Sequence, residues 1–352
     1  MKAACFRDVE TVAVDSIPLP RIEAPSDAIV EVKLAGLCGS DLHPFFGREA
    51  GLQPGTVMGH EFVGVVTEIG GEVATLAVGD SVCAPFTTNC GTCFYCNCGL
   101  TSRCPHGQLF GWRQSDHGLH GGQAQYVRVP LADGTLMKVP PGFSDDAALL
   151  LGDNLSTAFF AASLAIDEDE ISAKQSVLAV VGCGNVGLLG IVAAKQRGVA
   201  QVFAIDPNES RLRLAERLGA TVFEDPRAAI NAVSKATDGR GADAVMEFVG
   251  LPDAQRLAYD LVRPGGRVSV IGCHCTPHFA FSPAEAYDKN LTYRTGRCPA
   301  RHFMNTLPER IDPNELDLSW CITHRFAIDD AIEAYETFAY RRNGCIKAVL
   351  EF

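Results

Sequence analysis

Four cysteines in one short segment constrain this chain more than any other feature. They follow the spacing C-x2-C-x2-C-x7-C in CGTCFYCNCGLTSRC, at positions Cys90, Cys93, Cys96 and Cys104. The two-residue gaps let the backbone fold around one ion, and the longer gap lets the chain return to close a tetrahedral thiolate site. A zinc ion held this way has no open position, so it stabilises a loop and does no chemistry. Two alternatives stay open: unrelated buried cysteines, and an iron–sulfur cluster, whose common run closes with a shorter last gap.

A second set of candidate metal ligands is spread over three other segments. Cys38 lies in AGLCGSDLH, His60 in VMGHEFVGVV and Asp153 in LLLGDNLSTAFF. A catalytic zinc takes three protein ligands of mixed type and keeps the fourth position for substrate. Each residue alone has a plainer reading, since a single histidine is often a core residue and Asp153 suits a helix cap. Together with the cysteine segment, they predict a catalytic zinc site.

Composition limits the classes of function. The chain has 352 residues, more than one hydrophobic core usually supports, so we expect two domains. A net charge of −12 argues against nucleic acid or an anionic membrane as partner. No apolar run reaches the roughly 18 residues of a membrane span. The N-terminus lacks the apolar region of a signal peptide, so we expect the cysteines to serve metal binding in the cytoplasm.

The character of the chain changes twice along its length. Residues 1–153 are rich in glycine, proline and short strand-like runs, whereas residues 154–295 alternate apolar strands with helices. The last segment, 296–352, reads as helices and a closing strand. We therefore expect an α/β protein in which 1–153 and 296–352 form a β-rich domain with both metal sites. Residues 154–295 are expected to form a doubly wound parallel-sheet domain.

A glycine motif indicates a dinucleotide site in that second domain. Gly182-x-Gly184-x-x-Gly187 follows the strand-like run SVLAVV and opens a predicted helix, NVGLLGIVAAKQRG, which begins with Asn185 and Val186. The glycines allow the tight turn and close approach of a pyrophosphate, and the helix N-terminus attracts phosphate charge. The plainer alternative is a glycine-rich turn without a ligand. The strand–turn–helix context favours dinucleotide binding.

The next strand-like run, QVFAI, ends at Asp206. A carboxylate there can accept hydrogen bonds from both adenosine ribose hydroxyls, and it would repel a 2′-phosphate. NAD is therefore favoured over NADP. Arg211 follows five residues later, where it could steady Asp206, reach the adenosine end, or be an ordinary solvated charge.

Taken together, these motifs resemble the zinc-dependent alcohol dehydrogenases of the medium-chain dehydrogenase/reductase superfamily. The resemblance covers essentially the whole chain, from CGSDLH through GHE, the four cysteines and GCGNVG to IKAVLEF. It implies a GroES-like catalytic domain, a Rossmann domain, and oxidation of an alcohol by NAD in the cleft between them. It also implies a homodimer or homotetramer with a small-molecule alcohol or aldehyde as substrate.

The resemblance also suggests roles for single positions. Cys38, His60 and Asp153 match the catalytic-zinc ligands, and Glu61 matches a residue that ligates zinc permanently or only during ligand exchange. A permanent Glu61 bond would make the site anionic, because Cys38 and Asp153 already neutralise Zn²⁺. The remaining matches are the proton relay, Ser40 and His43; the substrate-pocket residue Phe86; and the cofactor-contacting residues Thr157, Ile271 and Lys347.

One segment departs from the prototype alcohol dehydrogenases. LFGWRQSDHGLHGG carries Trp112, His117 and His120, and it is closer to the formaldehyde-dehydrogenase-like subset of the family. That similarity does not establish formaldehyde as the substrate. We expect both histidines to be loop residues rather than ligands, and Phe86 and Trp112 to form apolar walls of the substrate pocket.

The mechanism implied is hydride transfer from a zinc-bound alkoxide to NAD. The proton leaves through Ser40, a ribose hydroxyl and His43. One alternative is a polyol or amino-alcohol dehydrogenase of the same superfamily, which would need polar groups in the pocket. Another is a catalytically silent NAD-binding relative, and the intact metal and relay residues argue against it. The sequence does not distinguish alcohol oxidation from aldehyde reduction.

Overall fold

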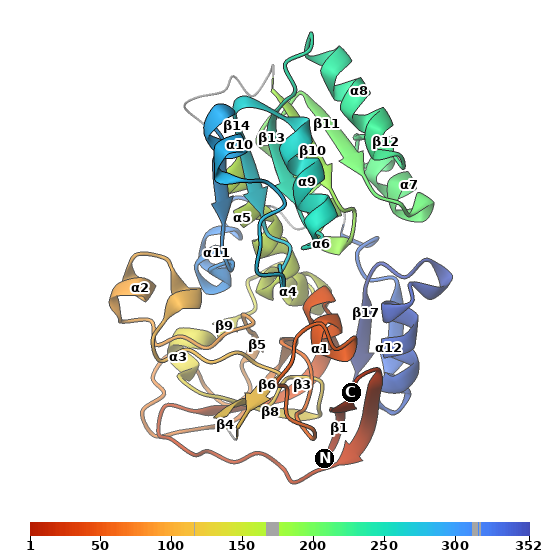
Figure 1. Cartoon of the computed structure of the whole chain (residues 1–352). Coiled ribbons are helices and arrows are strands. Elements are labelled where there is room, and N and C mark those ends of the chain that lie inside the picture. The colour runs from red at the N-terminus through yellow and green to blue at the C-terminus, as the bar shows by residue number, and fades with distance from the viewer. Residues whose placement is uncertain (116, 167–175, 312–315, 317) are drawn as a thin grey trace. The chain divides into compact units, whose positions relative to one another are not determined.

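The computed structural model describes residues 1–115, 117–166, 176–311, 316 and 318–352. Contacts divide the chain into two compact units, one of Met1–Ser156 with Pro299–Phe352 and one of Thr157–Cys298 (Figure 1). Ser156 and Cys298 each lie three residues beyond the expected boundaries, 153 and 295. The first unit is thus built from both ends of the chain, and the second from its middle.

The Thr157–Cys298 unit is organised around a parallel sheet. Within its described residues the sheet has six strands in the order β12-β11-β10-β13-β14-β15. Counted from β10, this order is 3-2-1-4-5-6, which is characteristic of dinucleotide-binding doubly wound folds. The bounds are β10 Val177–Val181, β11 Gln201–Ile205, β12 Thr221–Phe223, β13 Ala242–Glu247, β14 Val262–Val270 and β15 Thr292–Thr295.

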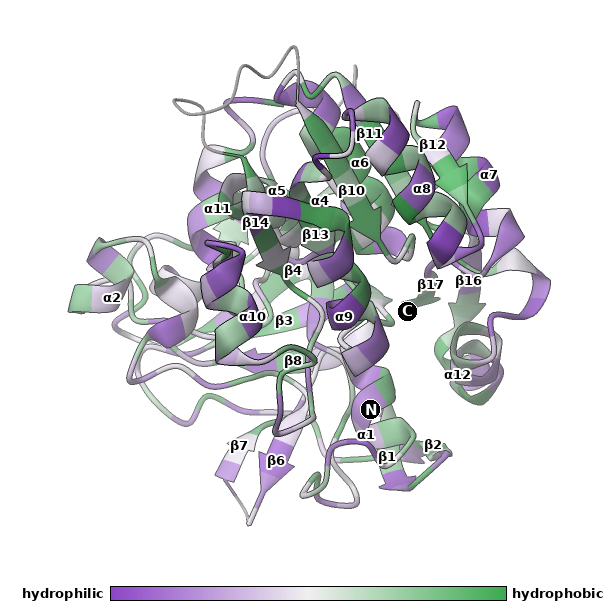
Figure 2. Cartoon of the chain, turned by 45° about the horizontal axis from the view of Figure 1, so that its top comes forward, coloured by the Kyte–Doolittle hydropathy of each residue, from purple (hydrophilic) through white to green (hydrophobic). Residues whose placement is uncertain are grey.

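Helices cover the sheet, which explains why its strands are apolar almost throughout. Every residue of β10 is buried, and the colouring of Figure 2 shows β10 and β11 as apolar. Alternate residues of β10 pack with α8 and α9, while Gly190 of α6 lies against Phe248 and Met246. The helices of this unit are α6 Asn185–Gln196, α7 Glu209–Arg217, α8 Pro226–Ala236, α9 Pro252–Leu261 and α10 Pro283–Asp288, and α5 Asn154–Ala165 begins in the other unit.

The other unit contains a larger, mostly antiparallel sheet. Its described part has seven strands, in the order β16-β17-β3-β4-β5-β9 with β8 paired to β3. The last strand of the chain, β17, runs antiparallel to β3 with Leu350 opposite Ala35, so the C-terminal segment shares a sheet with residues from the first part of the chain. Its strands are β3 Ala28–Gly36, β4 Glu61–Ile69, β5 Ser81–Cys83, β8 Tyr126–Val129, β9 Met137–Lys138, β16 His324–Ala327 and β17 Ala348–Glu351.

Short elements complete this unit. Two hairpins pair β1 Lys2–Asp8 with β2 Thr11–Ser16, and β6 Trp112–Gln114 with β7 His117–Leu119. Its helices are α1 Leu42–Phe45, α2 Phe94–Asn97, α3 Ala132–Thr135, α4 Asp145–Gly152, α11 Ala300–Thr306 and α12 Ala331–Ala339. Over the part of the chain that the structure describes, no single helix is long and apolar enough to cross a membrane; the bent pair α4 and α5 meets the length and composition test only jointly.

Candidate active site

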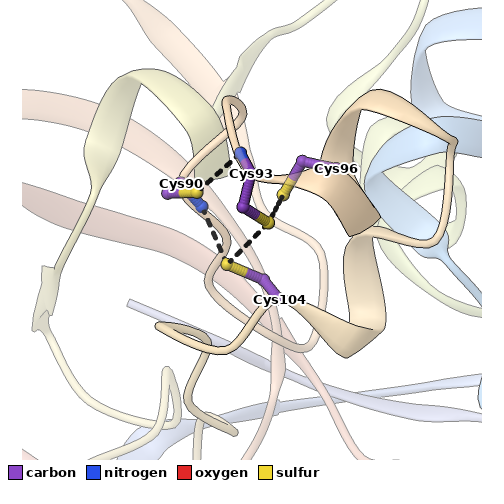
Figure 3. Close-up of side chains that lie close together, drawn as sticks. All are labelled: Cys90, Cys93, Cys96 and Cys104. Carbon is purple, nitrogen blue, oxygen red and sulfur yellow. Dashed lines mark hydrogen bonds between the residues drawn. The ribbon is translucent and has the colours of Figure 1, made fainter.

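In the segment of residues 90–104, here called the lobe, the side chains of Cys90, Cys93, Cys96 and Cys104 turn toward one another (Figure 3). All four sulfur atoms lie within 4.8 Å of one another. The Cys93 sulfur is 3.5 Å from that of Cys96 and 3.9 Å from that of Cys104. A tetrahedral zinc with bonds of about 2.3 Å separates its sulfur ligands by about 3.8 Å. The donor set and its spacing therefore fit one zinc ion.

Hydrogen-bond donors of the lobe are directed at its sulfur atoms. The backbone N–H of Cys93 donates to the Cys90 sulfur, and that of Cys90 donates to the Cys104 sulfur, each at 3.4 Å. Although burial opposes the change, donors from Thr92 and Cys93 lower the pKa of Cys90 to about 6. Such donors stabilise thiolate, which is the form of cysteine that binds a metal. The backbone of the lobe is thus arranged for anionic sulfur.

A second cluster combines residues from three segments. Cys38 follows β3, and His60 and Glu61 stand at the start of β4; because Gly36 of β3 pairs with Glu61, the antiparallel register brings these ends together. Asp153 lies between α4 and α5 with φ −144° and ψ −74°, outside helical geometry. The residues predicted as catalytic-zinc ligands therefore meet in one place in the fold.

The distances within this cluster match a mixed-ligand zinc site. One carboxylate oxygen of Asp153 is 3.5 Å from the Cys38 sulfur and 3.5 Å from Nε2 of His60. Tetrahedral zinc with ordinary bond lengths places S and O, or N and O, about 3.4–3.6 Å apart. Burial and the charge of Asp153 raise the pKa of Cys38 to about 11. A buried thiol and carboxylate this close need a cation if both are to be anionic, so the donor set fits zinc.

Glu61 belongs to the same cluster but is held by other groups. It forms a buried ion pair with Lys347, and its other oxygen accepts a hydrogen bond from the Asn154 amide at 2.7 Å. Lys347 also donates to the backbone oxygen of Leu37 at 3.2 Å. A Cβ at Gly36 would lie only 2.0 Å from a Glu61 oxygen, so glycine provides the space for this carboxylate. The charge of Glu61 is thus balanced by Lys347.

Asp41 supports the cluster from behind. One of its oxygens lies 3.1 Å from Nδ1 of His60, and the other accepts the backbone N–H of Cys38 at 2.9 Å. Burial alone would lower the pKa of His60, but the charges of Asp41 and Cys38 raise it well above the usual value. A carboxylate on one ring nitrogen orients the other nitrogen toward a metal. Asp41 therefore connects two of the predicted ligands.

In the Thr157–Cys298 unit, the glycine motif forms a tight turn between β10 and α6. Gly182 has φ +92°, and a Cβ there would lie 2.6 Å from the Val249 side chain. A Cβ at Gly187 would lie 1.9 Å from the backbone oxygen of Gly182, so the helix can approach the strand only with glycine there. Gly184 precedes the first residue of α6. The turn has the geometry expected of a phosphate-binding loop.

Asp206 lies directly after β11, beside this turn. Its carboxylate accepts the backbone N–H of Cys183 and that of Asn208, each at 2.8 Å. Arg211, on α7, has a guanidinium nitrogen 3.8 Å from the same carboxylate. The sequence left the role of Arg211 open; in the structure its guanidinium lies beside the Asp206 carboxylate.

Comparison with known proteins decides the family. The model described as "Alcohol dehydrogenase GroES-like domain" matches residues 24–141, and that described as "Zinc-binding dehydrogenase" matches residues 185–311. The zinc-type alcohol dehydrogenase B of Aspergillus flavus is 42% identical over 345 residues, covering 96% of this chain and 78% of its own length. The chain belongs to the zinc-type alcohol dehydrogenase family.

Two further relatives agree with this family assignment. The medium chain reductase/dehydrogenase ucsI of an Acremonium species is 47% identical over 292 residues, which is 82% of this chain and 98% of ucsI. The solved structure of alcohol dehydrogenase TADH from Thermus sp. ATN1 superposes with a TM-score of 0.88 at 35% identity, covering 100% of this chain and 99% of TADH. The predicted architecture, a GroES-like domain plus a Rossmann domain, is confirmed.

The residues predicted for the proton relay, the substrate pocket and the cofactor contacts lie on different elements. The Ser40 hydroxyl is 3.3 Å from the Cys38 sulfur, and Phe86 lies edge-on to the His60 ring at 6.3 Å between centroids. His43 is on α1, and burial lowers its pKa. Trp112 packs against an apolar cluster that includes Leu37 and Met58. Thr157 is on α5, and Ile271 directly follows β14.

The two histidines expected in loops differ in their surroundings. His120 accepts the backbone N–H of Val57 at 3.0 Å and lies 3.2 Å from an Arg113 nitrogen, so it holds neighbouring segments together. His117 is exposed on β7. The expectation that they are not metal ligands stays a prediction.

Sequence reasoning missed three residues that surround the cluster of predicted zinc ligands: Asp41, Asn154 and Gln123. Asp41 had a usable signal, because it stands three residues after Cys38 in a turn where a carboxylate can accept the N–H of the first residue. Asn154 and Gln123 had none, because their hydrogen bonds reach 93 residues back to Glu61 and 82 back to Asp41. Only the folded arrangement reveals them.

Proposed function

We propose that this protein is an NAD-dependent dehydrogenase that interconverts a small alcohol with its aldehyde or ketone. One observation carries the proposal: in a zinc-type alcohol dehydrogenase, ligand atoms of Cys38, His60, Glu61 and Asp153 come within 4.8 Å of one another in a buried cluster. Zinc bound there supplies Lewis acidity, which favours loss of an alcohol proton and polarises a carbonyl. The rest of the chemistry depends on the residues around it.

We assign the permanent ligands to Cys38, His60 and Asp153. Thiolate and carboxylate together carry two negative charges, which balance Zn²⁺ and leave the site neutral. Glu61 is occupied by Lys347 and Asn154, so its charge does not add to the ligand set. A neutral site is the better Lewis acid, because extra negative charge on the ligands weakens the pull on substrate oxygen. Glu61 is then available for ligand exchange only.

Ser40 and His43 are assigned to proton transfer. The Ser40 hydroxyl stands 3.3 Å from the Cys38 sulfur, at the edge of the ligand cluster, where it can accept the proton of a substrate hydroxyl. Burial lowers the pKa of His43, so this imidazole is neutral at pH 7 and can accept a proton. His43 lies on α1, directly after the turn that carries Ser40. Ser40 and His43 would supply the two protein members of the relay, with a cofactor ribose hydroxyl between them.

The preference for NAD is assigned to Asp206. Two backbone N–H groups hold its carboxylate at the end of β11, next to the glycine turn. There the carboxylate would accept a hydrogen bond from an adenosine ribose hydroxyl. A fixed negative charge there repels a 2′-phosphate. Arg211 pairs with Asp206, so the positive charge of Arg211 is partly neutralised and does not reverse the preference for NAD over NADP. Thr157 and Ile271 are further proposed cofactor contacts.

The substrate is assigned to the class of small, mainly apolar alcohols, with polyols and amino alcohols as the alternative. Phe86 beside His60 supplies an apolar surface next to the zinc ligands. A polyol or amino-alcohol enzyme would need additional polar groups at this position. Trp112 packs against the apolar cluster that includes Leu37 and Met58, so the inference of an apolar substrate pocket rests on Phe86.

The test is NADH formation across a panel of primary and secondary alcohols, polyols and amino alcohols, each with NAD and with NADP. Turnover of a simple alcohol with NAD, abolished in Asp153→Asn, supports the proposal. Turnover limited to polyols or amino alcohols favours the alternative substrate class. A zinc-loaded protein that binds NADH but turns over no member of the panel refutes the enzymatic assignment.

A further inference from the structure

A chain of buried polar side chains connects α12 with the His60 ligand. The Tyr335 hydroxyl donates to the Gln123 side-chain oxygen at 2.7 Å. The Gln123 amide nitrogen lies 3.5 Å from an oxygen of Asp41, whose other oxygen is 3.1 Å from Nδ1 of His60. Tyr335, Gln123 and Asp41 are at most 5% exposed, so water does not compete for these hydrogen bonds. Four side chains from four segments thus form one connected path.

The Tyr335 hydroxyl determines which way the Gln123 amide faces. A glutamine side chain has a donating NH₂ end and an accepting oxygen end. Here the NH₂ end faces two acceptors, the backbone oxygen of Gly36 at 3.0 Å and the carboxylate of Asp41. The reversed amide would place its oxygen against both acceptors. The hydroxyl donated by Tyr335 therefore favours the orientation that supports Asp41.

The path is held in place by its surroundings. The backbone of Gln123 donates to Met58 and accepts from Ala4, at 3.0 and 2.9 Å. Gly59, at φ +87°, leaves room for the Gln123 side chain, because a Cβ there would lie 2.4 Å from Gln123 Cγ. The Tyr335 ring packs beside Phe45 at 5.6 Å between centroids. Both side chains are thus buried among fixed neighbours, with Tyr335 1% and Gln123 0% exposed.

Asp41 is the member through which this path acts on the ligands. It accepts from the backbone N–H of Cys38 and from Gln123 on one oxygen, and faces His60 with the other. A donated N–H from a neutral amide keeps the carboxylate oriented without cancelling its charge. With Nδ1 of His60 engaged by Asp41, Nε2 faces Asp153 at 3.5 Å. The orientation of the histidine ligand thus depends on groups two and three contacts away.

We propose that Gln123 and Tyr335 are positioning residues of the catalytic zinc site. They act through Asp41 to fix the His60 ring, and so set the geometry and affinity of the metal. The proposal rests on the proposed function, because it takes the cluster of Cys38, His60 and Asp153 as the catalytic zinc site. It goes beyond it by assigning the support of that site to a tyrosine on α12, a helix more than 270 residues further along the chain than His60.

The test combines Tyr335→Phe and Gln123→Met with the metal itself as probe. Zinc affinity is measured by competition with a chelator, and cobalt(II) is exchanged for zinc to read the ligand field from its visible spectrum. Loss of a group hydrogen-bonded directly to a metal ligand costs 10–100-fold in metal affinity. Gln123 lies one contact beyond Asp41, which is bonded directly to the ligand His60, and Tyr335 lies two contacts beyond it. We therefore expect a loss of up to about tenfold for Tyr335→Phe and a larger one for Gln123→Met.

The control is Tyr126→Phe, which removes a tyrosine hydroxyl bonded to Glu31 at 2.8 Å in the same unit. It should leave the cobalt spectrum and zinc affinity as in the wild type. Because Tyr335 and Gln123 act in series, the double variant should lose less zinc affinity than the product of the two single losses.

Two results overturn the proposal. If Tyr335→Phe lowers only the melting temperature and keeps the wild-type cobalt spectrum and zinc affinity, the hydrogen bonds serve folding alone. If Tyr335→Phe alters the spectrum no more than Tyr126→Phe does, the path does not reach His60. A wild type that holds zinc only in the lobe would instead refute the proposed function, which separates the two failures.

Discussion

The lobe and the Cys38 cluster both suit zinc, yet they are built in opposite ways. The lobe draws its four thiols from residues 90–104, and three of them are partly exposed. The cluster of Cys38, His60, Glu61 and Asp153 draws on three distant segments, and all four residues are buried. A local motif can be recognised by spacing alone, whereas a dispersed site exists only after the sheet has formed.

Their supporting hydrogen bonds differ in the same sense. Backbone N–H groups point at the lobe sulfurs, so the loop conformation itself supplies the support. Around the other cluster, side chains do this work, with Asp41 on His60 and Asn154 with Lys347 on Glu61. Side-chain substitutions should therefore tune the second site strongly. The lobe should respond mainly to loss of its own ligands.

The largest expected effect separates Asp153 from its neighbour Glu61. Asp153→Asn should remove the catalytic zinc or leave it nearly inactive, because the site loses a negatively charged ligand. The transition state then loses several kcal/mol of Lewis-acid stabilisation, which corresponds to a decrease in kcat of about a thousandfold or more. Glu61→Gln is the matched variant and should keep zinc while turnover slows. Metal analysis and kinetics of both variants make the check. Full zinc and near-normal activity in Asp153→Asn would mean that Glu61 is the permanent ligand.

The second effect concerns the lobe. Cys104→Ser should lower the zinc content to about one per chain and destabilise the loop, because a structural zinc contributes its binding energy to folding. Cys98→Ser is the control, since Cys98 is an exposed thiol inside the same segment. Zinc analysis and limited proteolysis report the outcome. Equal zinc loss in both variants would contradict the assignment of the four ligands.

A third prediction tests the Thr157–Cys298 unit, which has no predicted zinc site. Asp206→Ser should shift the preference for NAD over NADP by at least about tenfold, because each charge-assisted hydrogen bond contributes about 1.5–3 kcal/mol. Zinc content should stay as in the wild type. Glu209→Ser, which alters an exposed carboxylate nearby on α7, is the control for kcat/KM with both cofactors. A wild type that already prefers NADP would refute the role of Asp206.

A fourth prediction uses the close approach of Gly36 to Glu61. Gly36→Ala should displace the Glu61 carboxylate and destabilise the protein by about 1–3 kcal/mol, as overpacking of a buried site does. Gly39→Ala is the matched control, because a Cβ at Gly39 meets nothing within 4 Å. Thermal unfolding of the two variants is compared. Equal melting temperatures would show that Glu61 has more freedom than its contacts indicate.

The smallest effect is a pH dependence of stability. Burial lowers the pKa of His43 below its usual 6.5, so the folded state binds fewer protons than the unfolded state just below that pH. The free energy of unfolding should therefore decrease as the pH falls from 6.5 through the lower pKa of His43 in the folded state, because the buried imidazole resists protonation. His43→Asn should show a shallower loss over that window in denaturant unfolding. An unchanged pH profile would argue against a buried, neutral His43.

Sequence alone predicted much of this molecule, and the reasons differ from part to part. The doubly wound parallel sheet around the glycine motif followed from alternating apolar strands and helices, and cysteine spacing predicted the lobe, because both patterns are local. Lys347 shows the limit, since the resemblance suggested a cofactor contact for it, whereas its buried ion pair with Glu61 was not foreseen and appears only in the structure. Gln123 and Tyr335, 212 residues apart, become visible as partners only in the folded structure.

Zinc content followed through chelator treatment tests the central claim most directly, namely that two metal sites carry separate roles. The freshly purified wild type should contain about two zinc ions per chain. A chelator should remove one in step with activity, while the other stays until the lobe unfolds. A single zinc, a visible iron–sulfur absorbance, or loss of the first zinc with activity intact would contradict the account.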